Sequence, residues 1–509
     1  MPSNSTIHDT LIVGAGFTGL GAAIKLRQAG VDDIVLVERA DRVGGTWRDN
    51  VYPGAACDIP SLLYSFSFVK NPSWSRAYPS GGEICAHIES MVDEFGLRPH
   101  IRFNTEVTGL SFDESAGVWT VTTKGRKKFQ ARTVVLAGGP LADHKLPDIR
   151  GIDTYEGHKI HSAAWDGDYD FTGKRVAVIG TGASAVQIVP ELVKTAQSGK
   201  VFQRTPGWVL PRLDVQMPEA VQSLFAAVPA TQELARQALY WGHEASATAL
   251  VWKSPLSSLV ARLGRAHLRR QVKDPWLRRQ LTPDFTPGCK RMLVSSDYYP
   301  ARQRDNCKLI DWPIATLSPV GIRTSDGVEH HLDAIVFATG YDVHLSGPPF
   351  PVTGLGGRSL QHEWAGHAEA YKSASAHGYP NLLFMCGPNS GPGHNSLLVY
   401  VEGQLDYAVA GITTILKNNL RYLDVRADVQ GRYNEVIQQR LTKTTWMSGC
   451  NSWYLTADGF NASMYPGFAT QYLRQMRDFQ IADYTAHARS ESDAGVALDA
   501  RPRVVTSTA

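Results

Sequence analysis

Residues 8–19 read HDTLIVGAGFTG, an apolar, strand-like run that ends in a glycine-rich turn. A helical pattern follows over 20–28, and a second apolar run over 34–38 ends in a glutamate. In this setting the first glycine makes the tight turn, the second lets the backbone approach a pyrophosphate, and the third lets the helix pack on the strand. A carboxylate at the end of the second strand can hold a ribose 2′-hydroxyl. The stretch therefore predicts a dinucleotide-binding domain whose cofactor contacts are Gly14, Gly16, Gly19 and Glu38.

The same pattern returns at 174–185, KRVAVIGTGASA, and a helical run and a strand at 201–204 follow it. Arg204 now holds the position that Glu38 holds in the first copy. A carboxylate there repels a 2′-phosphate, whereas a guanidinium binds it through charge-assisted, bidentate hydrogen bonds. The first copy therefore suits FAD or NAD and the second suits NADP(H), which indicates a flavin–nicotinamide oxidoreductase. The alternative is that Arg204 is only a solvated cation at the end of a strand.

Two further strand-like runs, 133–139 and 334–341, each lie well downstream of one glycine-rich turn. We expect each run to return the chain across a sheet and to complete one dinucleotide domain. The predicted fold class is therefore α/β, with two Rossmann-like dinucleotide-binding domains, for FAD and NADP. The second domain is inserted in the first, so the chain should return to the first domain from Phe350 onwards.

Composition limits the partners that the protein can have. The length of 509 residues predicts about three domains. The residues are 43% hydrophobic and 19% charged, which is enough for a buried hydrophobic core. Lys and Arg number 51 against 48 Asp and Glu, a net charge of +3 that argues against a nucleic-acid partner. No apolar run reaches the roughly 18 residues of a transmembrane segment. The polar residues 1–10 do not resemble a secretory signal.

The six cysteines stand far apart, with no CxxC pair and no zinc-like spacing. This pattern disfavours a disulfide-reductase flavoprotein and predicts no metal site. It also predicts free thiols in a reducing cytoplasm.

Two signatures resemble those of a known family. Residues 155–166, YEGHKIHSAAWD, resemble the FxGxxxHxxxW(P/D) signature of type I Baeyer–Villiger monooxygenases, class B flavoproteins related to the flavin-containing monooxygenases. The fingerprint positions are Gly157, His161 and Trp165, and the one departure is Tyr155 for Phe. Residues 44–58, GGTWRDNVYPGAACD, resemble the family's GGxWxxxxYPGxxxD segment. The Trp-Asp ending of the first signature favours the Baeyer–Villiger branch.

The resemblance implies roles for cofactor-binding residues. Beside the four contacts named above, it places FAD against Gly45, Thr46, Trp47, Asp58, Tyr64 and Val107. It places NADP(H) against Gly180, Gly182, Ser184, Arg204, Thr205, Lys290 and Trp453. Downstream of Trp453 the family's usual GxNxPGK continuation is replaced by Leu455-Thr456-Ala457-Asp458-Gly459-Phe460.

The resemblance also implies the catalytic residues and the reaction. Arg291 resembles the family's active-site arginine, with Asp58 as its carboxylate partner. A fixed guanidinium suits the negative charge that develops in the reaction, because Arg stays protonated in a dry site. The implied activity is FAD- and NADPH-dependent insertion of one oxygen atom from O2 into a ketone, through a flavin peroxide, to give an ester or lactone. Oxygenation of amines or sulfides, as in flavin-containing monooxygenases, and a non-enzymatic NADP(H)-sensing flavoprotein are the alternatives.

Other residues invite functional interpretations that we weigh against structural ones. His161 is expected to be a hinge residue and Trp165 a packing anchor, rather than catalytic groups. His394, in the Gly/Pro-rich loop 391–396, is expected to line the flavin rather than act as a base. The oligomeric state is not readable from the sequence.

The predicted domain organisation has six segments. The segments are 1–148 and 346–485 for FAD, 149–210 and 288–345 for NADP, a helical insertion at 211–287 that shields the nicotinamide domain, and a mobile tail at 486–509. Within the insertion, residues 261–270 are basic and amphipathic, so a membrane-surface helix is the alternative interpretation.

Overall fold

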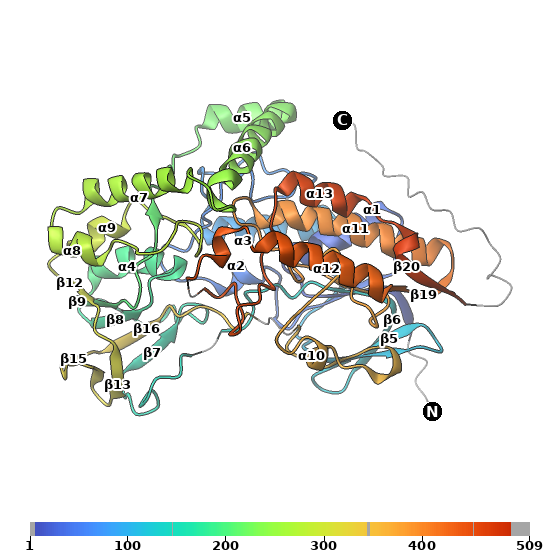
Figure 1. The fold of residues 1–509 in the computed structure, drawn as a ribbon, viewed down its shortest axis with the longest axis horizontal. Helices are drawn as coiled ribbons and strands as arrows, with labels where there is room; N and C mark the ends of the chain where they lie inside the picture. The colour runs from blue at the N-terminus through green and yellow to red at the C-terminus, as the bar shows by residue number, and fades with distance from the viewer. Residues whose placement is uncertain (1–5, 145, 344–346, 451, 490–509) are drawn as a thin grey trace.

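The computed structural model describes residues 6–144, 146–343, 347–450 and 452–489. Two sheets dominate this part of the chain and lie in two neighbouring lobes (Figure 1). The first sheet has eight strands and the second has five. The helices α5 and α6 rise above both lobes, at the top of Figure 1.

The first sheet has the order β17-β4-β5-β6-β1-β2-β3, with β18 also paired to β6. The strand β1 is parallel to both β2 and β6, so the run that ends at 136 does return beside the first strand, as predicted. The strands β4, β5 and β6 form an antiparallel meander, which the sequence analysis did not predict. The bounds are β1 (Ile7–Val13), β2 (Ile34–Val37), β3 (Ile101–Arg102), β4 (Val107–Asp113), β5 (Val118–Thr123), β6 (Lys128–Leu136), β17 (Val352–Thr353) and β18 (Leu382–Phe384).

Helices from both ends of the chain cover this sheet. The helix α1 (Phe17–Gln28) follows the first glycine turn and packs against α11 (Leu397–Lys417), which in turn contacts α13 (Ala469–Arg477). The helices α3 (Gly81–Glu94) and α12 (Ala427–Leu441) complete this layer. The largest apolar core of the protein lies among these helices and the sheet.

The second sheet is parallel and has the order β12-β9-β8-β16-β7. Its strands lie between β6 and β17 in the chain, which confirms that the second domain is inserted in the first. The helix α4 (Ala183–Thr195) follows the second glycine turn. The strand bounds are β7 (His158–His161), β8 (Arg175–Ile179), β9 (Ser198–Phe202), β12 (Cys307–Ile310) and β16 (Ala334–Phe337), and the small sheet of β13 (Ile314–Ser318), β14 (Gly321–Thr324) and β15 (Glu329–His331) flanks them.

The helical insertion bridges the two lobes instead of shielding the second one alone. It consists of α5 (Glu219–Ala227), α6 (Pro229–Leu250), α7 (Ser257–Gln271) and α8 (Pro275–Gln280). On α6, Arg236 donates to the backbone oxygens of Leu62 and Ser65 and pairs with Glu402 at 3.0 Å. These partners belong to the first lobe, and they supply the acceptors that a buried guanidinium needs. The helix α7 lies against β10 (Val209–Leu210), which pairs with β11 (Leu293–Val294).

The predicted tail begins inside a strand. The strand β20 (Tyr484–Ala488) pairs antiparallel with β19 (Leu420–Val425), so residues 486–488 are ordered by backbone hydrogen bonds, contrary to the expectation for 486–509. Residues 490–509 lie outside the described residues. Within the described chain, no helix combines the length and the apolar character that crossing a membrane requires.

The expectation of free thiols is wrong for two cysteines. Cys289 and Cys450 form a disulfide across 161 residues of sequence, with their Cα atoms 6.3 Å apart. The other four, Cys57, Cys85, Cys307 and Cys386, are free. The sequence spacing of Cys289 and Cys450 does not indicate a disulfide, because only the packing of two distant loops brings these cysteines together.

Candidate active site

The first glycine turn has the geometry that a pyrophosphate site requires. Gly14 has φ of +100°, and a Cβ there would lie 2.7 Å from the backbone oxygen of Ala137. A Cβ at Gly19 would lie 1.9 Å from the backbone oxygen of Gly14, so this glycine permits helix-on-strand packing. A Cβ at Gly16 would approach only Gly45, at 3.6 Å. The backbone at Gly16 is therefore open to a ligand at the N-terminus of α1, where free N–H groups favour an anion.

A cavity of about 520 Å³ opens at this turn. It extends from the ends of β1 and β2 to the loop 386–391 and the start of α11. The predicted FAD contacts that line it are Gly14, Gly16, Glu38, Gly45, Thr46, Trp47, Tyr64 and Val107, and Trp453 also lines it. Its size and its glycine-rich, partly apolar wall fit a bound dinucleotide.

The Glu38 carboxylate makes hydrogen bonds within the protein that the sequence did not predict. Glu38 is 4% exposed, and its carboxylate accepts hydrogen bonds from the backbone N–H groups of Ala15, at 2.9 Å, and Ala40, at 3.0 Å. Arg48 donates to the same carboxylate at 2.9 Å and also pairs with Asp49. Oε1 accepts from Ala40 and Arg48, whereas Oε2 accepts from Ala15 alone. A carboxylate oxygen can accept two hydrogen bonds, so Oε2 keeps capacity for a ribose hydroxyl. Sequence reasoning missed Arg48, although it lies inside the signature 44–58.

Two aromatic residues form one wall of the cavity. The Trp47 indole N–H donates to the Tyr64 hydroxyl at 3.1 Å, and the two rings meet edge to face at 5.6 Å. Burial raises the pKa of Tyr64, so its hydroxyl stays protonated. The helix α2 (Thr46–Asp49) begins directly after Gly45 and places Thr46 and Trp47 at this wall.

The second glycine turn repeats the first. Gly180 has φ of +121°, and a Cβ there would lie 2.3 Å from the backbone oxygen of Ala338. Nothing lies within 4 Å of a Cβ built at Gly182, which precedes α4. Ser184 lies in the first turn of this helix. The turn therefore offers a second open anion site at a helix N-terminus.

Two cations lie near each other beyond this turn. Burial and the charge of Arg204 lower the pKa of Lys290, whose ammonium group also lies 4.9 Å from the centre of the Phe285 ring. Neighbouring like charges repel each other, and an anion between them removes the repulsion. Thr205 follows Arg204 in the chain, and its backbone oxygen accepts from the Thr181 hydroxyl at 2.7 Å.

Asp58 and Arg291 are 233 residues apart in sequence and form a bidentate ion pair. The Arg291 Nε–H donates to Asp58 Oδ2 at 2.9 Å, and Nη2–H donates to Oδ1 at 2.6 Å. The Asp58 carboxylate raises the pKa of the Arg291 guanidinium further above its usual value. The Asp58 side chain is 19% exposed and that of Arg291 is 51% exposed, so the guanidinium keeps N–H groups open to a ligand.

Two neighbours of this pair, Cys57 and Tyr454, are not charged at neutral pH. Burial raises the pKa of Cys57, and it raises the pKa of Tyr454 to about 12. Trp453, 50% exposed, packs beside Tyr454 with ring centres 4.5 Å apart. The Cys289–Cys450 disulfide joins the loop before Arg291 to the loop before Trp453. Arg291 and Trp453 therefore lie on two loops that are covalently tied.

The fingerprint residues lie at the start of the second domain. A Cβ at Gly157 would lie 2.2 Å from the Tyr155 hydroxyl. His161 ends β7 and stacks on His144 at 4.7 Å, and burial together with His144 lowers the pKa of His161 to about 4. Trp165 stacks on Phe171 at 5.4 Å within the core of that domain. These contacts agree with structural roles, since a neutral buried histidine adds no charge to a site.

His394 is fully buried and joins the insertion to the first domain. Its Nε2 lies 3.0 Å from Glu244 on α6. The Glu244 carboxylate also accepts from the backbone N–H groups of Ala469, at 3.1 Å, and Thr470, at 2.9 Å, where α13 begins. The sequence analysis did not foresee this cluster, because its members lie on three separate segments.

Comparisons with known proteins find a matching family model and relatives that span most of the chain. Residues 11–227 match a family model described as pyridine nucleotide-disulphide oxidoreductase. A Baeyer–Villiger monooxygenase of Streptomyces coelicolor is 42% identical over 492 residues, which cover 95% of this chain and 94% of that protein. A Baeyer–Villiger monooxygenase of Pseudomonas aeruginosa is 41% identical over 475 residues, covering 93% and 90%.

Solved structures show the same likeness. An oxidized steroid monooxygenase bound to NADP has a TM-score of 0.83 and 29% identity, and the match covers 95% of this chain and all (100%) of that one. A closed cyclohexanone monooxygenase has a TM-score of 0.84 and 28% identity with the same coverage, 95% and 100%.

Proposed function

The chain belongs to the family of Baeyer–Villiger monooxygenases, and from this premise we propose that it oxygenates a ketone beside the Asp58–Arg291 pair. The reaction consumes a ketone, O2, NADPH and a proton, and it yields an ester or lactone, NADP⁺ and water. When bound, NADPH supplies the hydride and FAD activates oxygen, so the redox chemistry belongs to the cofactors. The protein binds and orients these groups and stabilises developing charge.

The two glycine turns divide the cofactors between the domains. FAD binds in the cavity of the first domain, where Gly14 and Gly16 admit its pyrophosphate and Trp47 and Tyr64 form the wall. NADP binds at the N-terminus of α4, with Arg204 and Lys290 on its 2′-phosphate. Two neighbouring cations are the feature that favours NADPH over NADH.

Arg291 acts on the ketone. Addition of oxygen to the carbonyl carbon turns the carbonyl oxygen into a negatively charged one, and a guanidinium beside it stabilises that charge. Asp58 holds the guanidinium by its Nε and Nη2 groups and leaves its remaining N–H groups for the substrate. The bidentate pair is the observation that carries the proposal, because it fixes a permanent cation between the two cofactor domains.

The substrate is a small-molecule ketone. Which ketones the site accepts depends on loops that include Trp453. We place the enzyme in the cytoplasm, where NADPH is produced: the four free thiols support this location, whereas the Cys289–Cys450 disulfide argues against it, because disulfides are rare in reducing compartments. Cell fractionation with activity assays of each fraction tests the location.

The deciding experiment is product analysis under ¹⁸O2. The purified, FAD-loaded enzyme is given NADPH and, separately, cyclic, linear and aryl ketones and a thioether. We expect an ester or lactone that carries one ¹⁸O atom, with NADPH consumed in equal amount. Sulfoxide formation without ester from any ketone would instead indicate a flavin-containing monooxygenase that oxygenates heteroatoms.

A further inference from the structure

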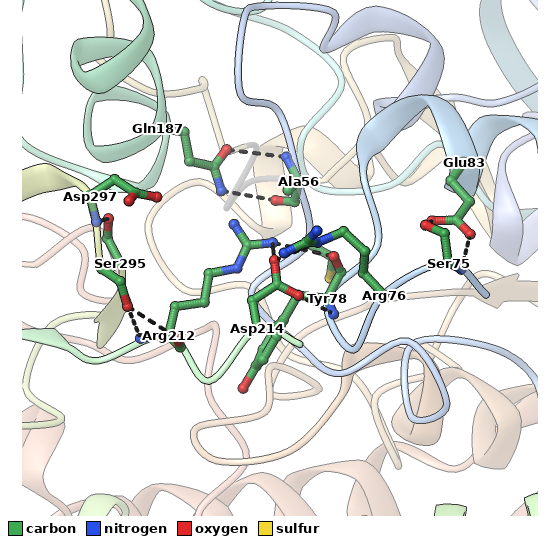
Figure 2. Close-up of polar contacts among 12 residues, drawn as sticks. Ala56, Ser75, Arg76, Tyr78, Glu83, Gln187, Arg212, Asp214, Ser295 and Asp297 are labelled. Carbon is green, nitrogen blue, oxygen red and sulfur yellow. Dashed lines mark hydrogen bonds and ion pairs between the residues drawn. The ribbon is translucent and has the colours of Figure 1, made fainter. Parts of the chain in front are cut away.

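One glutamine joins the helix of the second domain to the segment that carries Asp58. Gln187 lies on α4, three residues beyond Ser184. Its amide accepts from the Tyr52 hydroxyl at 2.9 Å and donates to the backbone oxygen of Ala56 at 2.9 Å. It also accepts from the Ala56 N–H at 3.4 Å, so both ends of the amide face one backbone residue (Figure 2). Ala56 is two residues before Asp58.

The backbones of the two domains touch at this contact. Gly54 has φ of +79°, and a Cβ there would lie 2.9 Å from the backbone oxygen of Gln187. A side chain at position 54 would push the segment away from α4. The close approach and the hydrogen bonds of Gln187 therefore fix the distance between helix and segment together.

The first domain holds the same segment from the other side. Gly81 N–H donates to Ala55 O at 2.8 Å, and Cys57 N–H donates to Pro79 O at 3.0 Å. The stretch 55–57 is thus a narrow strip between residues 79–81 and Gln187, and Ala56 forms an isolated antiparallel bridge with Ser80. The direction in which the Asp58 side chain leaves this strip depends on both supports.

A second contact ties residues 76–78 to the chain that leads out of the second domain. Arg212 donates to Tyr78 O at 3.3 Å, and Asp214 pairs with Arg76 at 3.0 Å (Figure 2). The Tyr78 N–H donates to Asp214 at 3.3 Å. Arg212 follows β10, whose partner β11 begins two residues after Arg291. Asp58 and Arg291 therefore both lie close to segments that contacts between the domains hold in place.

We propose that Gln187 is a positioning residue for the oxygenation reaction. Its hydrogen bonds fix the Asp58 carboxylate, and through it Arg291, relative to α4 and the expected NADP site. Without the Gln187 side chain, the segment 52–58 loses its side-chain hydrogen bonds to α4, and Asp58 no longer holds the guanidinium in one orientation. This inference rests on the proposed function, because it assigns Gln187 a part in the same reaction.

The test uses Gln187→Met, which keeps the length of the side chain and removes its hydrogen bonds. We expect an unchanged FAD content and a KM for NADPH within about two-fold of the parent. We expect ester formed per NADPH consumed and kcat to fall about 10-fold, since small displacements in an active site have effects of this size or larger. The matched control is Gln303→Met, which removes a glutamine that donates to Gln271 O at 2.6 Å and accepts from Lys273 N–H at 3.0 Å within one lobe. This control should behave as the parent.

Two measurements separate positioning from general stability. Hydrogen–deuterium exchange of the FAD-loaded chain should be faster over residues 52–58 in Gln187→Met and unchanged in the control. In a double-mutant cycle on NADPH oxidation in the presence of ketone, Gln187→Met should add little to Asp58→Ala, because both act through the same carboxylate. Full additivity, or a parental yield of ester per NADPH in Gln187→Met, would overturn the proposal.

A variant that fails to fold does not end the test. Gln187→Glu keeps the shape and the contact from Tyr52, but it cannot donate to Ala56 O. It should therefore show the same fall in ester formed per NADPH consumed. A Gln187→Glu enzyme with the parental yield of ester per NADPH contradicts the inference. If the parent itself forms no ester, the proposed function fails, while the exchange rates over 52–58 and the cycle on NADPH oxidation still decide the role of Gln187.

Discussion

At the scale of single residues, the Arg291 guanidinium should dominate the chemical step. Arg291→Ala removes the charge and should lower the rate of ester formation by about 10²–10³-fold, the cost typical of a lost oxyanion donor. Arg291→Lys keeps a charge but loses the planar fork that matches Asp58, so we expect an intermediate rate. The measurement is ester formed per minute at saturating NADPH, with FAD content as the control. A parental rate in Arg291→Ala would contradict the role.

Arg204 should decide which nicotinamide cofactor the enzyme uses. Arg204→Ala should raise the KM for NADPH by about 10–100-fold, because a hydrogen bond to a charged group contributes about 1.5–3 kcal/mol. The KM for NADH, which lacks the 2′-phosphate, should hardly change. The matched control is Arg323→Ala on β14, where the guanidinium pairs with Glu329 at 3.1 Å. Equal effects on both cofactors would refute the assignment.

At the scale of elements, Glu244 should fix α6 against α13. Burial raises the pKa of this carboxyl, but hydrogen bonds from His394 and Thr470 outweigh it and lower the pKa to about 2. A folded-state pKa below the unfolded value means that the stabilisation is present above about pH 4.3 and is lost as the pH falls toward 2. Glu244→Gln should therefore reduce the free energy of unfolding at pH 6 by about 2–3 kcal/mol.

Urea unfolding between pH 6 and pH 3 measures this effect. The parent should lose stability as the pH falls, whereas Glu244→Gln should show a flatter profile, so that the two converge at low pH. Glu233→Gln, the same change at a more exposed position of the same helix, is the control. A constant difference between parent and Glu244→Gln across this range would show that the carboxylate charge is not the cause.

At the scale of the whole molecule, the Cys289–Cys450 disulfide ties the insertion-side loop to the first domain. Titration of the unfolded protein should find four thiols before reduction, from the six cysteines less the two in the bond, and six after it. Cys450→Ser should lower the free energy of unfolding by about 2–4 kcal/mol under oxidising conditions, and Cys85→Ser should not. Six thiols before reduction would contradict the bond.

The two similar glycine-turn segments, 8–38 and 174–204, show how much of the fold local sequence predicts. The glycine turns, the strands β1 and β8, the helices α1 and α4 and the nesting of the domains follow from patterns of ten to thirty residues. The meander of β4 to β6 escaped prediction, because its strands pair across turns that carry no glycine fingerprint. The strand β20 escaped as well, since only its partner β19 makes the polar segment 484–488 a strand.

By itself the sequence determined the two dinucleotide turns, because strand, turn and helix are set by neighbouring residues and by the conformations that only glycine adopts. The family resemblance, and no spacing argument, suggested that Asp58 meets Arg291. Only the tertiary structure decided that Gln187 supports the Asp58 segment, that Glu244 joins three segments, and that Cys289 meets Cys450. These contacts join residues more than 100 positions apart, so their formation depends on how whole domains pack, and no local pattern records that packing.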